Sequence, residues 1–198
     1  MAIQINGNGT ITGISVGGLP DGIVDTDMIA ANAVTAAKRG AGAVLQVQSV
    51  LKQNGFSATA SSGSFSDITG LSVNITMTSS SNKVLVLFQS SFSTGGDVNQ
   101  RGSFRLLRGS TVIGAASADG QSTNQCSFPG MGVTHTGKAL PVAGSFLDAP
   151  GTGTHTYKLQ VGAEGGAGTV IVNAPGSNGT GNTHFKGVSS IILMEVAA

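Results

Sequence analysis

The stretch LSVNITMTSSSNKVLVLFQS, residues 71–90, decides the fold class of this chain. Its first seven residues alternate strictly between small polar residues and the apolar residues Leu71, Val73, Ile75 and Met77. Alternation with a period of two is typical of a β-strand with one buried face. After the turn TSSSN, the run KVLVLFQS is apolar on both faces and predicts a strand that is covered on both sides.

Short apolar runs of the same kind continue outward from this stretch in both directions. They lie at 44–53, 131–137, 139–148, 155–161, 169–173 and 189–196, with a hairpin around Arg108-Gly109-Ser110. Such short strands, separated by turn residues at fairly even spacing, predict a mainly β fold, either an antiparallel β-sandwich or a jelly roll. The two longest stretches without this pattern, 115–130 and 174–187, are expected to be exposed loops.

The N-terminal part of the chain has a different pattern. Residues 1–20 form a Gly-rich extended leader, and DTDMIAANAVTAAKRG (25–40) predicts a short helical segment that ends at Gly40. A helix of about three turns is marginal on its own in water, so this part should order only against a partner. We therefore expect two domains: residues 1–43, a segment that orders against a partner, and residues 44–198, a β jelly-roll domain.

Charge and composition exclude several classes of partner. Only 10% of the residues are charged and the formal net charge is +1, without the clustered Lys and Arg of a nucleic-acid-binding surface. No apolar run approaches the length that crosses a membrane, so neither nucleic-acid binding nor membrane insertion is expected. Low charge offers little self-repulsion, and strands that are apolar on both faces need further cover, so both features indicate assembly.

The sequence predicts no catalytic residue, no metal site and no cofactor. GISVG (13–17) matches a nucleophile elbow but lacks the preceding α/β context. GVTHTGKA (132–139) matches a phosphate-binding loop except at Ala139, where Ser or Thr is required. The three histidines lack the spacing of metal ligands. The protein is therefore expected not to be an enzyme.

Three residues are candidates for ligand contact: Arg101 and Arg105, which share one face of a strand, and His135. An acidic glycan or an acidic protein partner would fit the two arginines. The alternative is that these side chains are solvated or lie in a subunit interface, as most surface arginines do.

INGNGTITGISVGGLPDGIVDTDMIAANAVTAAK, near the N-terminus, resembles the N-terminal segment of tail-fibre and other appendage proteins of tailed bacteriophages. Those segments combine a similar leader, an LPDG turn and ten-residue units of the form GAVTxAK. NAVTAAK (32–38) fits this unit with Asn32 in place of Gly, whereas the preceding unit departs from it at Met28. The remainder is similar to the trimeric TNF-like jelly-roll knobs of such proteins, at 65–93, 104–114, 153–161 and 189–196.

The resemblance implies a non-enzymatic structural protein of a bacteriophage virion, assembled in the host cytoplasm. It would be a homotrimeric fibre or head-decoration protein, attached to capsid or tail proteins by its N-terminal segment, with the knob projecting outward for host-surface adsorption. The alternative is a carbohydrate-binding host-recognition module of a tail fibre, whose partner is a host surface glycan. The residues expected at the attachment and trimer interface are Ile3, Ile5, Ile11, Leu19, Ile23, Met28, Ile29 and Val34.

Overall fold

The computed structural model describes the chain as two units. The described residues are 4–5, 11–12, 29, 33–35, 38–61, 63–95, 101–116, 127–128, 139–164, 168–176 and 186–198. One unit spans Met1–Arg39 and the other spans Gly40–Ala198. Within the described residues the elements are antiparallel strands, so the mainly β architecture predicted from the sequence is confirmed.

In the first unit, β1 (Gln4–Ile5) pairs with β2 (Ile11–Thr12). The helix predicted over 25–40 is not shown, and most of that range lies outside the described residues. Its described part contains one turn, in which the Lys38 N–H donates to the Thr35 carbonyl oxygen at 3.0 Å. A hydrogen bond over three residues is that of a single 3₁₀ turn, which is all that this part of the segment forms.

The second unit contains ten strands within the described residues. They are β3 (Val44–Lys52), β4 (Phe56–Ala60), β5 (Phe65–Met77), β6 (Lys83–Gly95), β7 (Arg101–Arg108), β8 (Thr111–Ile113), β9 (Leu140–Asp148), β10 (Gly153–Glu164), β11 (Gly168–Val172) and β12 (Ser189–Val196). The predicted hairpin around Gly109 is confirmed as the β7–β8 turn. The run predicted at 131–137 lies outside the described residues.

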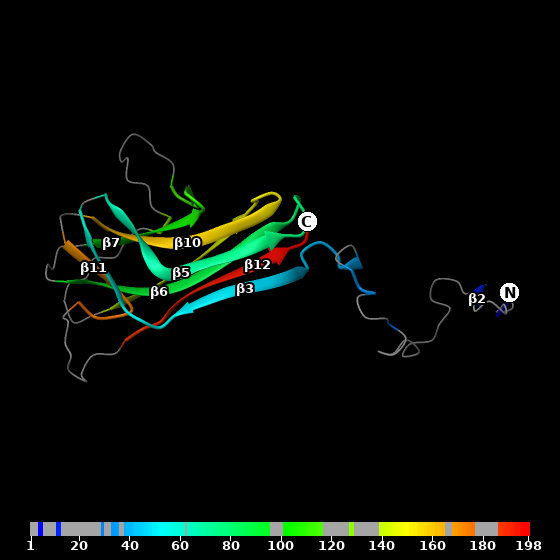
Figure 1. Cartoon of the computed structure of the whole chain (residues 1–198), viewed down its shortest axis with the longest axis horizontal. Helices are drawn as coiled ribbons and strands as arrows, with labels where there is room; N and C mark the ends of the chain where they lie inside the picture. The colour runs from blue at the N-terminus through cyan, green and yellow to red at the C-terminus, as the bar shows by residue number, and fades with distance from the viewer. Residues whose placement is uncertain are drawn as a thin grey trace. The chain divides into compact units, whose positions relative to one another are not determined.

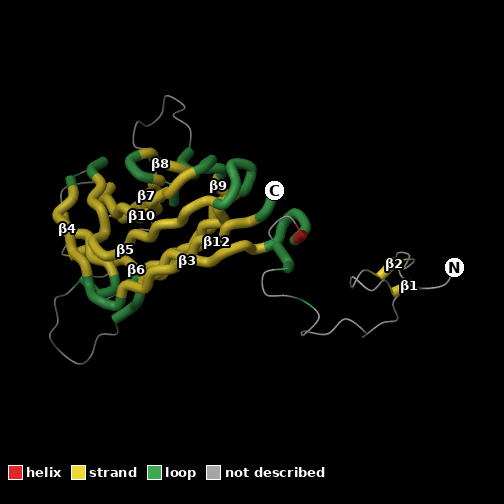
Figure 2. The backbone as a smooth tube through the Cα atoms, turned by 45° about the vertical axis from the view of Figure 1, so that its right-hand side comes forward, coloured by secondary structure: helices red, strands yellow, loops and turns green. Residues whose placement is uncertain are grey.

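The strands of the second unit form two sheets, which run side by side in Figures 1 and 2. The β6 sheet has the order β3-β12-β6-β11-β4, with β9 on the other edge of β6, and the β10 sheet has the order β5-β10-β7-β8. Eight strands remain when the short strands β4 and β11 are left out, and they pair in a nested order. β3 pairs with β12, β5 with β10, β6 with β9, and β7 with β8. This nested pairing is that of a jelly roll.

A β-bulge corrects the register of the long strand β5. Ile68 and Leu71 are both buried although an odd number of positions separates them, and the pairing with β10 shifts between Lys158 and Gln160. Gly70 between them has φ +80°, a conformation that glycine adopts without steric cost. The bulge therefore keeps both ends of β5 facing the core.

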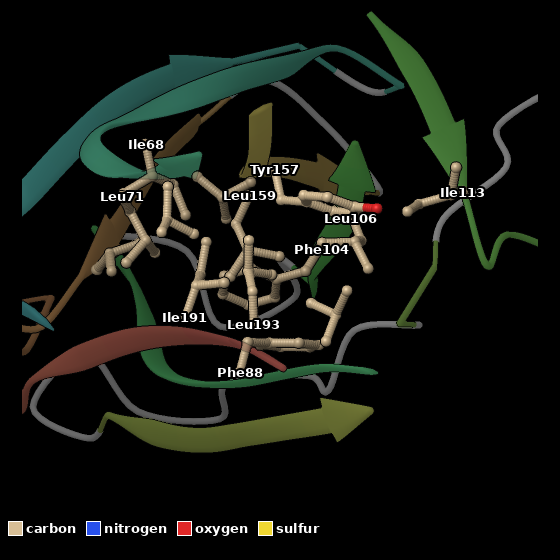
Figure 3. Packing of buried hydrophobic residues seen from close by; sticks show 14 of the residues in the cluster. Ile68, Leu71, Phe88, Phe104, Leu106, Ile113, Tyr157, Leu159, Ile191 and Leu193 are labelled. Carbon is tan, nitrogen blue, oxygen red and sulfur yellow. The ribbon is translucent and has the colours of Figure 1, made fainter. Parts of the chain in front are cut away.

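The core lies between the two sheets. Side chains of the two sheets pack against each other there, as Figure 3 shows. Those of the β10 sheet include Phe104, Leu106, Tyr157 and Leu159, and those of the β6 sheet include Phe88, Ile191 and Leu193. Apart from the bulge in β5, the core side chains come from alternate positions of each strand, which is why period-two patterning located them in the sequence.

The stretch 115–130, expected to be an exposed loop, contributes to the core at one point, so that part of the expectation is wrong. The Phe104 N–H donates to the Phe128 carbonyl oxygen at 3.0 Å, and the Phe128 ring packs edge-on against Phe88 with centroids 4.4 Å apart. A Cβ on Gly144 would overlap with the Phe128 ring, so the missing side chain of Gly144 makes room for it. Most of both predicted loops lies outside the described residues.

Replacing Gly102 with alanine should lower the free energy of unfolding by about 3 kcal/mol, a typical cost of overpacking a core. A Cβ at Gly102 would overlap with the Phe92 ring, which is fully buried and packs edge-on against Phe104. Urea unfolding measures the change. Gly40→Ala is the matched control, since a Cβ there meets nothing within 4 Å. Equal stability of the two variants would contradict this account of the packing.

Candidate interaction surface

The outer face of the β6 sheet carries an apolar row that crosses four strands. Val47 of β3 lies opposite Met194 of β12, Met194 lies opposite Leu85 of β6, and Leu85 lies opposite Leu147 of β9. The next two rows, both on the same side of the first, contain Leu51, Leu87, Ile192 and Ala143 with uncharged Ser and Gln residues. We call the eight apolar residues of these rows the outer apolar face; they are Val47, Leu51, Leu85, Leu87, Ala143, Leu147, Ile192 and Met194.

Much of the outer apolar face is open to solvent in the single chain. Val47, Leu51 and Leu147 are 52%, 58% and 51% exposed. Leu85 and Leu87 are half-buried, so the strand predicted to be covered on both faces is fully covered only on its inner face. None of the twelve residues in the three rows is charged. An uncharged apolar face of this kind is a candidate interaction site.

A hollow of about 510 Å³ lies in the outer apolar face. Half of its lining residues are small, and the full lining is Leu87, Phe88, Gln89, Ala143, Gly144, Ser145, Ser190 and Ile192. The small residues of β9 and β12 leave room beside Leu87 and Ile192, so the face has a recess that can receive a side chain from a partner.

The outer face of the β10 sheet is polar along β5 and β10. Ser72, Asn74 and Thr76 are exposed there, and the hydroxyls of Thr76 and Thr154 lie 2.8 Å apart. Hydrogen bonds from Lys158 and Gln160 lower the pKa of Asp67 on the same face. The two outer faces therefore differ in polarity. The apolar outer face of the β6 sheet is suited to contact with a protein, and the polar outer face of the β10 sheet is suited to contact with water.

Of the candidate ligand contacts, Arg105 and Arg101 both lie on β7, and His135 lies outside the described residues. The Arg105 guanidinium carbon is 3.7 Å from the centre of the Phe65 ring, a cation–π contact. Because Arg105 covers this ring face, Phe65 does not offer it to a stacking ligand. The main chain of Arg101 pairs with Glu164 at the end of β10.

The structure brings together two of the residues expected at the attachment and trimer interface. Ile5 and Ile11 are partners across the β1–β2 pair. Ile29 and Val34 are 45% and 55% exposed. Ile3, Leu19, Ile23 and Met28 lie outside the described residues. The interface role of all eight stays a prediction.

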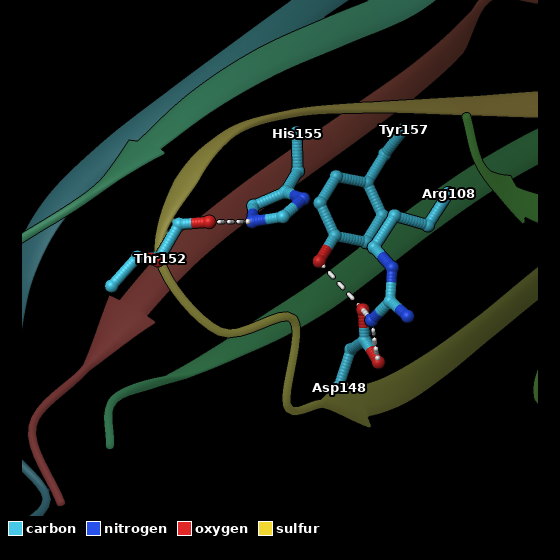
Figure 4. Close-up of polar contacts among 5 residues, drawn as sticks. All are labelled: Arg108, Asp148, Thr152, His155 and Tyr157. Carbon is cyan, nitrogen blue, oxygen red and sulfur yellow. Dashed lines mark hydrogen bonds and ion pairs between the residues drawn. The ribbon is translucent and has the colours of Figure 1, made fainter. Parts of the chain in front are cut away.

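Sequence reasoning missed two buried carboxylates, and the first is Asp148. Arg108 Nη1 lies 2.9 Å and 2.7 Å from its two oxygens, and the Tyr157 hydroxyl donates to it at 2.7 Å (Figure 4). Burial and the hydrogen bond to Asp148 raise the pKa of Tyr157 well above its ordinary value. Asp148 belongs to β9, whereas Arg108 and Tyr157 belong to β7 and β10, so this cluster ties the two sheets together.

The second buried carboxylate is Glu195 of β12, which is fully buried. Its carboxylate accepts four hydrogen bonds of 2.6 to 2.8 Å, from Gln46 Nε2, Asn82 Nδ2, and the N–H and hydroxyl of Thr78. Burial alone would raise the pKa of Glu195, but the hydrogen bonds from Asn82, Gln46 and Thr78 more than offset it and lower the pKa to about 2. The carboxylate thus holds β3, β12 and the β5–β6 turn together.

Neither carboxylate forms part of a recognisable reactive cluster. In the part of the chain that the structure describes, no group of three or more His, Cys, Asp or Glu residues is placed to hold a metal ion. No helix within the same residues is long and apolar enough to span a membrane. The oxygens of Asp148 and Glu195 are engaged by donors that belong to the fold itself, so their role is structural.

No protein-family model matches the chain, and no curated protein matches it. Similar solved structures include the structure of the infectious bursal disease virus Gx strain, at 14% identity and a TM-score of 0.34, covering 78% of this chain and 38% of that one. The VP2 subviral particle of the same virus follows at 16% identity and a TM-score of 0.36, covering 77% and 37%. The globular domain of the zebrafish complement 1qA protein has 13% identity and a TM-score of 0.32, covering 75% and 94%.

This chain therefore spans little more than a third of the length of the two viral chains. At TM-scores of 0.32 to 0.36, the three likenesses assign neither a family nor a function to it.

Proposed function

We propose that the chain is a non-enzymatic structural protein of a bacteriophage virion. In this proposal it acts as a homotrimer, with residues 1–43 attached to other virion proteins and the jelly-roll knob projecting outward. The observation that carries the proposal is the contrast between the outer apolar face and the polar outer face of the β10 sheet. A domain with one face of each kind is suited to burying the first against a partner and turning the second to solvent.

The partner we propose for the outer apolar face is a further copy of this chain. An uncharged face can meet a copy of itself without repulsion, and an exposed Val47 or Leu51 offers the kind of side chain that the hollow beside Leu87 would receive. The number three comes from the resemblance of the knob to trimeric jelly-roll knobs. The resemblance of the leader to phage attachment segments supports the role of residues 1–43.

Replacing Val47 with aspartate should convert the trimer to monomers. Val47 is 52% exposed in the single chain, so aspartate there costs the fold little, whereas burying an unpaired carboxylate in the interface costs several kcal/mol. Light scattering of the full chain should give three times the 19.6 kDa chain mass, and Val47→Asp should give that mass once.

The control for this experiment is Ser72→Asp, which puts the same charge on the polar outer face of β5 and should leave the trimer intact. Circular dichroism should give the same strand signal for all three proteins. A wild-type chain that stays monomeric at high concentration, or a Val47→Asp variant of unchanged mass, would overturn the proposed assembly.

The place of the protein on the particle is tested on intact virions. Gold-labelled antibodies against the knob should mark particles, at the head if the chain is a decoration protein and at the tail if it is a fibre. Particles that carry no label, from a host that produces the chain, would overturn the virion role.

A further inference from the structure

The turn between β3 and β4 presents an Asn-Gly pair to solvent. Asn54 and Gly55 are both exposed in the three-residue connection 53–55. Among the described residues, neither the Asn54 side chain nor the Gly55 N–H has a hydrogen-bond partner. The two groups that must react with each other in deamidation, the side-chain amide and the next backbone nitrogen, are therefore adjacent, belong to exposed residues and are not restrained by hydrogen bonds to the described part of the chain.

We propose that Asn54 is a site of spontaneous deamidation in the folded protein, and that the modification loosens β4. Water or hydroxide removes the Gly55 amide proton, and that nitrogen attacks Cγ of Asn54. The new C–N bond closes a five-membered succinimide as the bond from Cγ to Nδ2 breaks and ammonia leaves. Water then opens the ring at either carbonyl, giving aspartate or isoaspartate, with no change of oxidation state. Glycine at the second position favours ring closure because it has no Cβ to crowd the approach.

The other asparagines that the structure describes in the second unit lack this combination. Asn82 and Asn173 both have bonded side-chain amides, and Asn74 lies within β5, paired with Thr156. The residues that follow these three are Lys, Ala and Ile, each with a side chain that crowds the attacking nitrogen. The remaining Asn-Gly pairs, at Asn6, Asn8 and Asn178, lie outside the described residues.

The product would strain a specific contact, because the carbonyl of Asn54 is held by Asn173. Asn173 is fully buried, and its Nδ2 donates to the carbonyl oxygens of Lys52, at 3.0 Å, and Asn54, at 3.4 Å. In isoaspartate the main chain runs through Cβ and Cγ of residue 54, so the backbone gains one carbon and the former carbonyl becomes a free carboxylate. The added length and charge lie two residues before Phe56, where β4 begins its pairing with β11.

The test follows deamidation in the intact full chain. The protein is incubated in mildly alkaline buffer, digested with trypsin, and peptide 53–83 is sequenced by mass spectrometry. This one peptide contains Asn54, Asn74 and Asn82, so the latter two are internal controls. We expect the mass gain of an amide-to-acid exchange at Asn54 alone, isoaspartate labelling by an isoaspartate methyltransferase, and a rate that rises with pH. Equal modification at Asn74, or none at Asn54 while a short synthetic peptide of the same turn reacts, would overturn the site.

The matched variant is Gly55→Ala. A Cβ at position 55 would lie 3.7 Å from both Ala174 Cβ and the Val172 carbonyl oxygen, an ordinary contact, so the fold accepts it. Deamidation of Asn54 should slow by about tenfold in this variant, since the added methyl crowds the nitrogen. Hydrogen exchange of β4 should be faster in aged wild-type protein than in aged Gly55→Ala. An unchanged rate of deamidation, or equal exchange in the two aged proteins, contradicts the proposal.

Discussion

Replacing Asp148 with leucine should lower the free energy of unfolding by about 4 kcal/mol, a typical cost of breaking a buried ion pair by removing one partner. Asp148 is the acceptor for both the Arg108 guanidinium and the Tyr157 hydroxyl, and Tyr157 is completely buried. Leucine fills a similar volume but accepts no hydrogen bond, so the tyrosine hydroxyl would stay buried and unsatisfied. Chemical denaturation of wild type and variant at the same protein concentration measures the loss.

A double-mutant cycle with Tyr157→Phe separates the cluster from simple repacking. Tyr157→Phe alone removes the buried hydroxyl together with its need for an acceptor, so it should cost about 1 kcal/mol. In the Tyr157→Phe background, Asp148→Leu should cost less than in wild type, because no hydroxyl is left unsatisfied. If the two losses simply add, Asp148 and Tyr157 are not coupled, and the cluster does not tie the sheets together.

The period of the sequence located the strands and their inner faces but not the partners of their polar residues. Strict alternation over 71–77 correctly placed Leu71 and Ile75 in the core, because a strand exposes successive side chains to opposite faces. The same rule says nothing about contacts between distant positions. Gln46 and Glu195 are 149 residues apart in the chain and meet only because β3 and β12 are neighbours in the jelly roll.

Of two local irregularities, the entry of Phe128 into the core was out of reach from pattern alone, whereas the bulge at Gly70 was not. Phe128 lies in a stretch without strand periodicity, and it enters the core because Gly144, on a distant strand, leaves a space of the right size. The bulge at Gly70 had a visible signal, since the spacing of Ile68 and Leu71 breaks the period of two beside a glycine. Such a break with an adjacent glycine is a sequence signature of a bulge.

The structure adds a second candidate interface to the one that the sequence predicts in the leader and the helical segment. The first stays a prediction, and the second is an apolar surface on the knob itself. Its signal was already present in KVLVLF (83–88) and SSIILMEV (189–196), where outward positions such as Leu85 and Ile192 are as apolar as the inward ones. Periodicity could not separate a strand buried inside one chain from a strand covered by a second chain, because the two patterns are identical.

Acidification should remove about 3 kcal/mol of stability that Glu195 provides, since its pKa falls from an ordinary value of 4.5 to about 2 in the folded protein. A lowered folded-state pKa means that the unfolded chain binds the proton first. The stabilisation is therefore complete at neutral pH and begins to fade as the pH falls through about 4.5. It is lost when the pH reaches about 2, where the folded protein also takes up the proton.

Glu195→Gln isolates this contribution because it keeps the size of the side chain and removes the titration. The variant should be less stable than wild type by about 3 kcal/mol at neutral pH, and the gap should narrow steadily as the pH falls toward about 2. Glutamine also places an amide donor among Gln46, Asn82 and Thr78, which already donate there. The expected loss of stability of the variant at neutral pH is therefore a lower bound. Urea unfolding of wild type and variant at several pH values and one protein concentration measures the gap. A gap that stays constant with pH would mean that Glu195 stabilises the protein by packing alone, and an absent gap would mean that its four donors are as well satisfied without the charge.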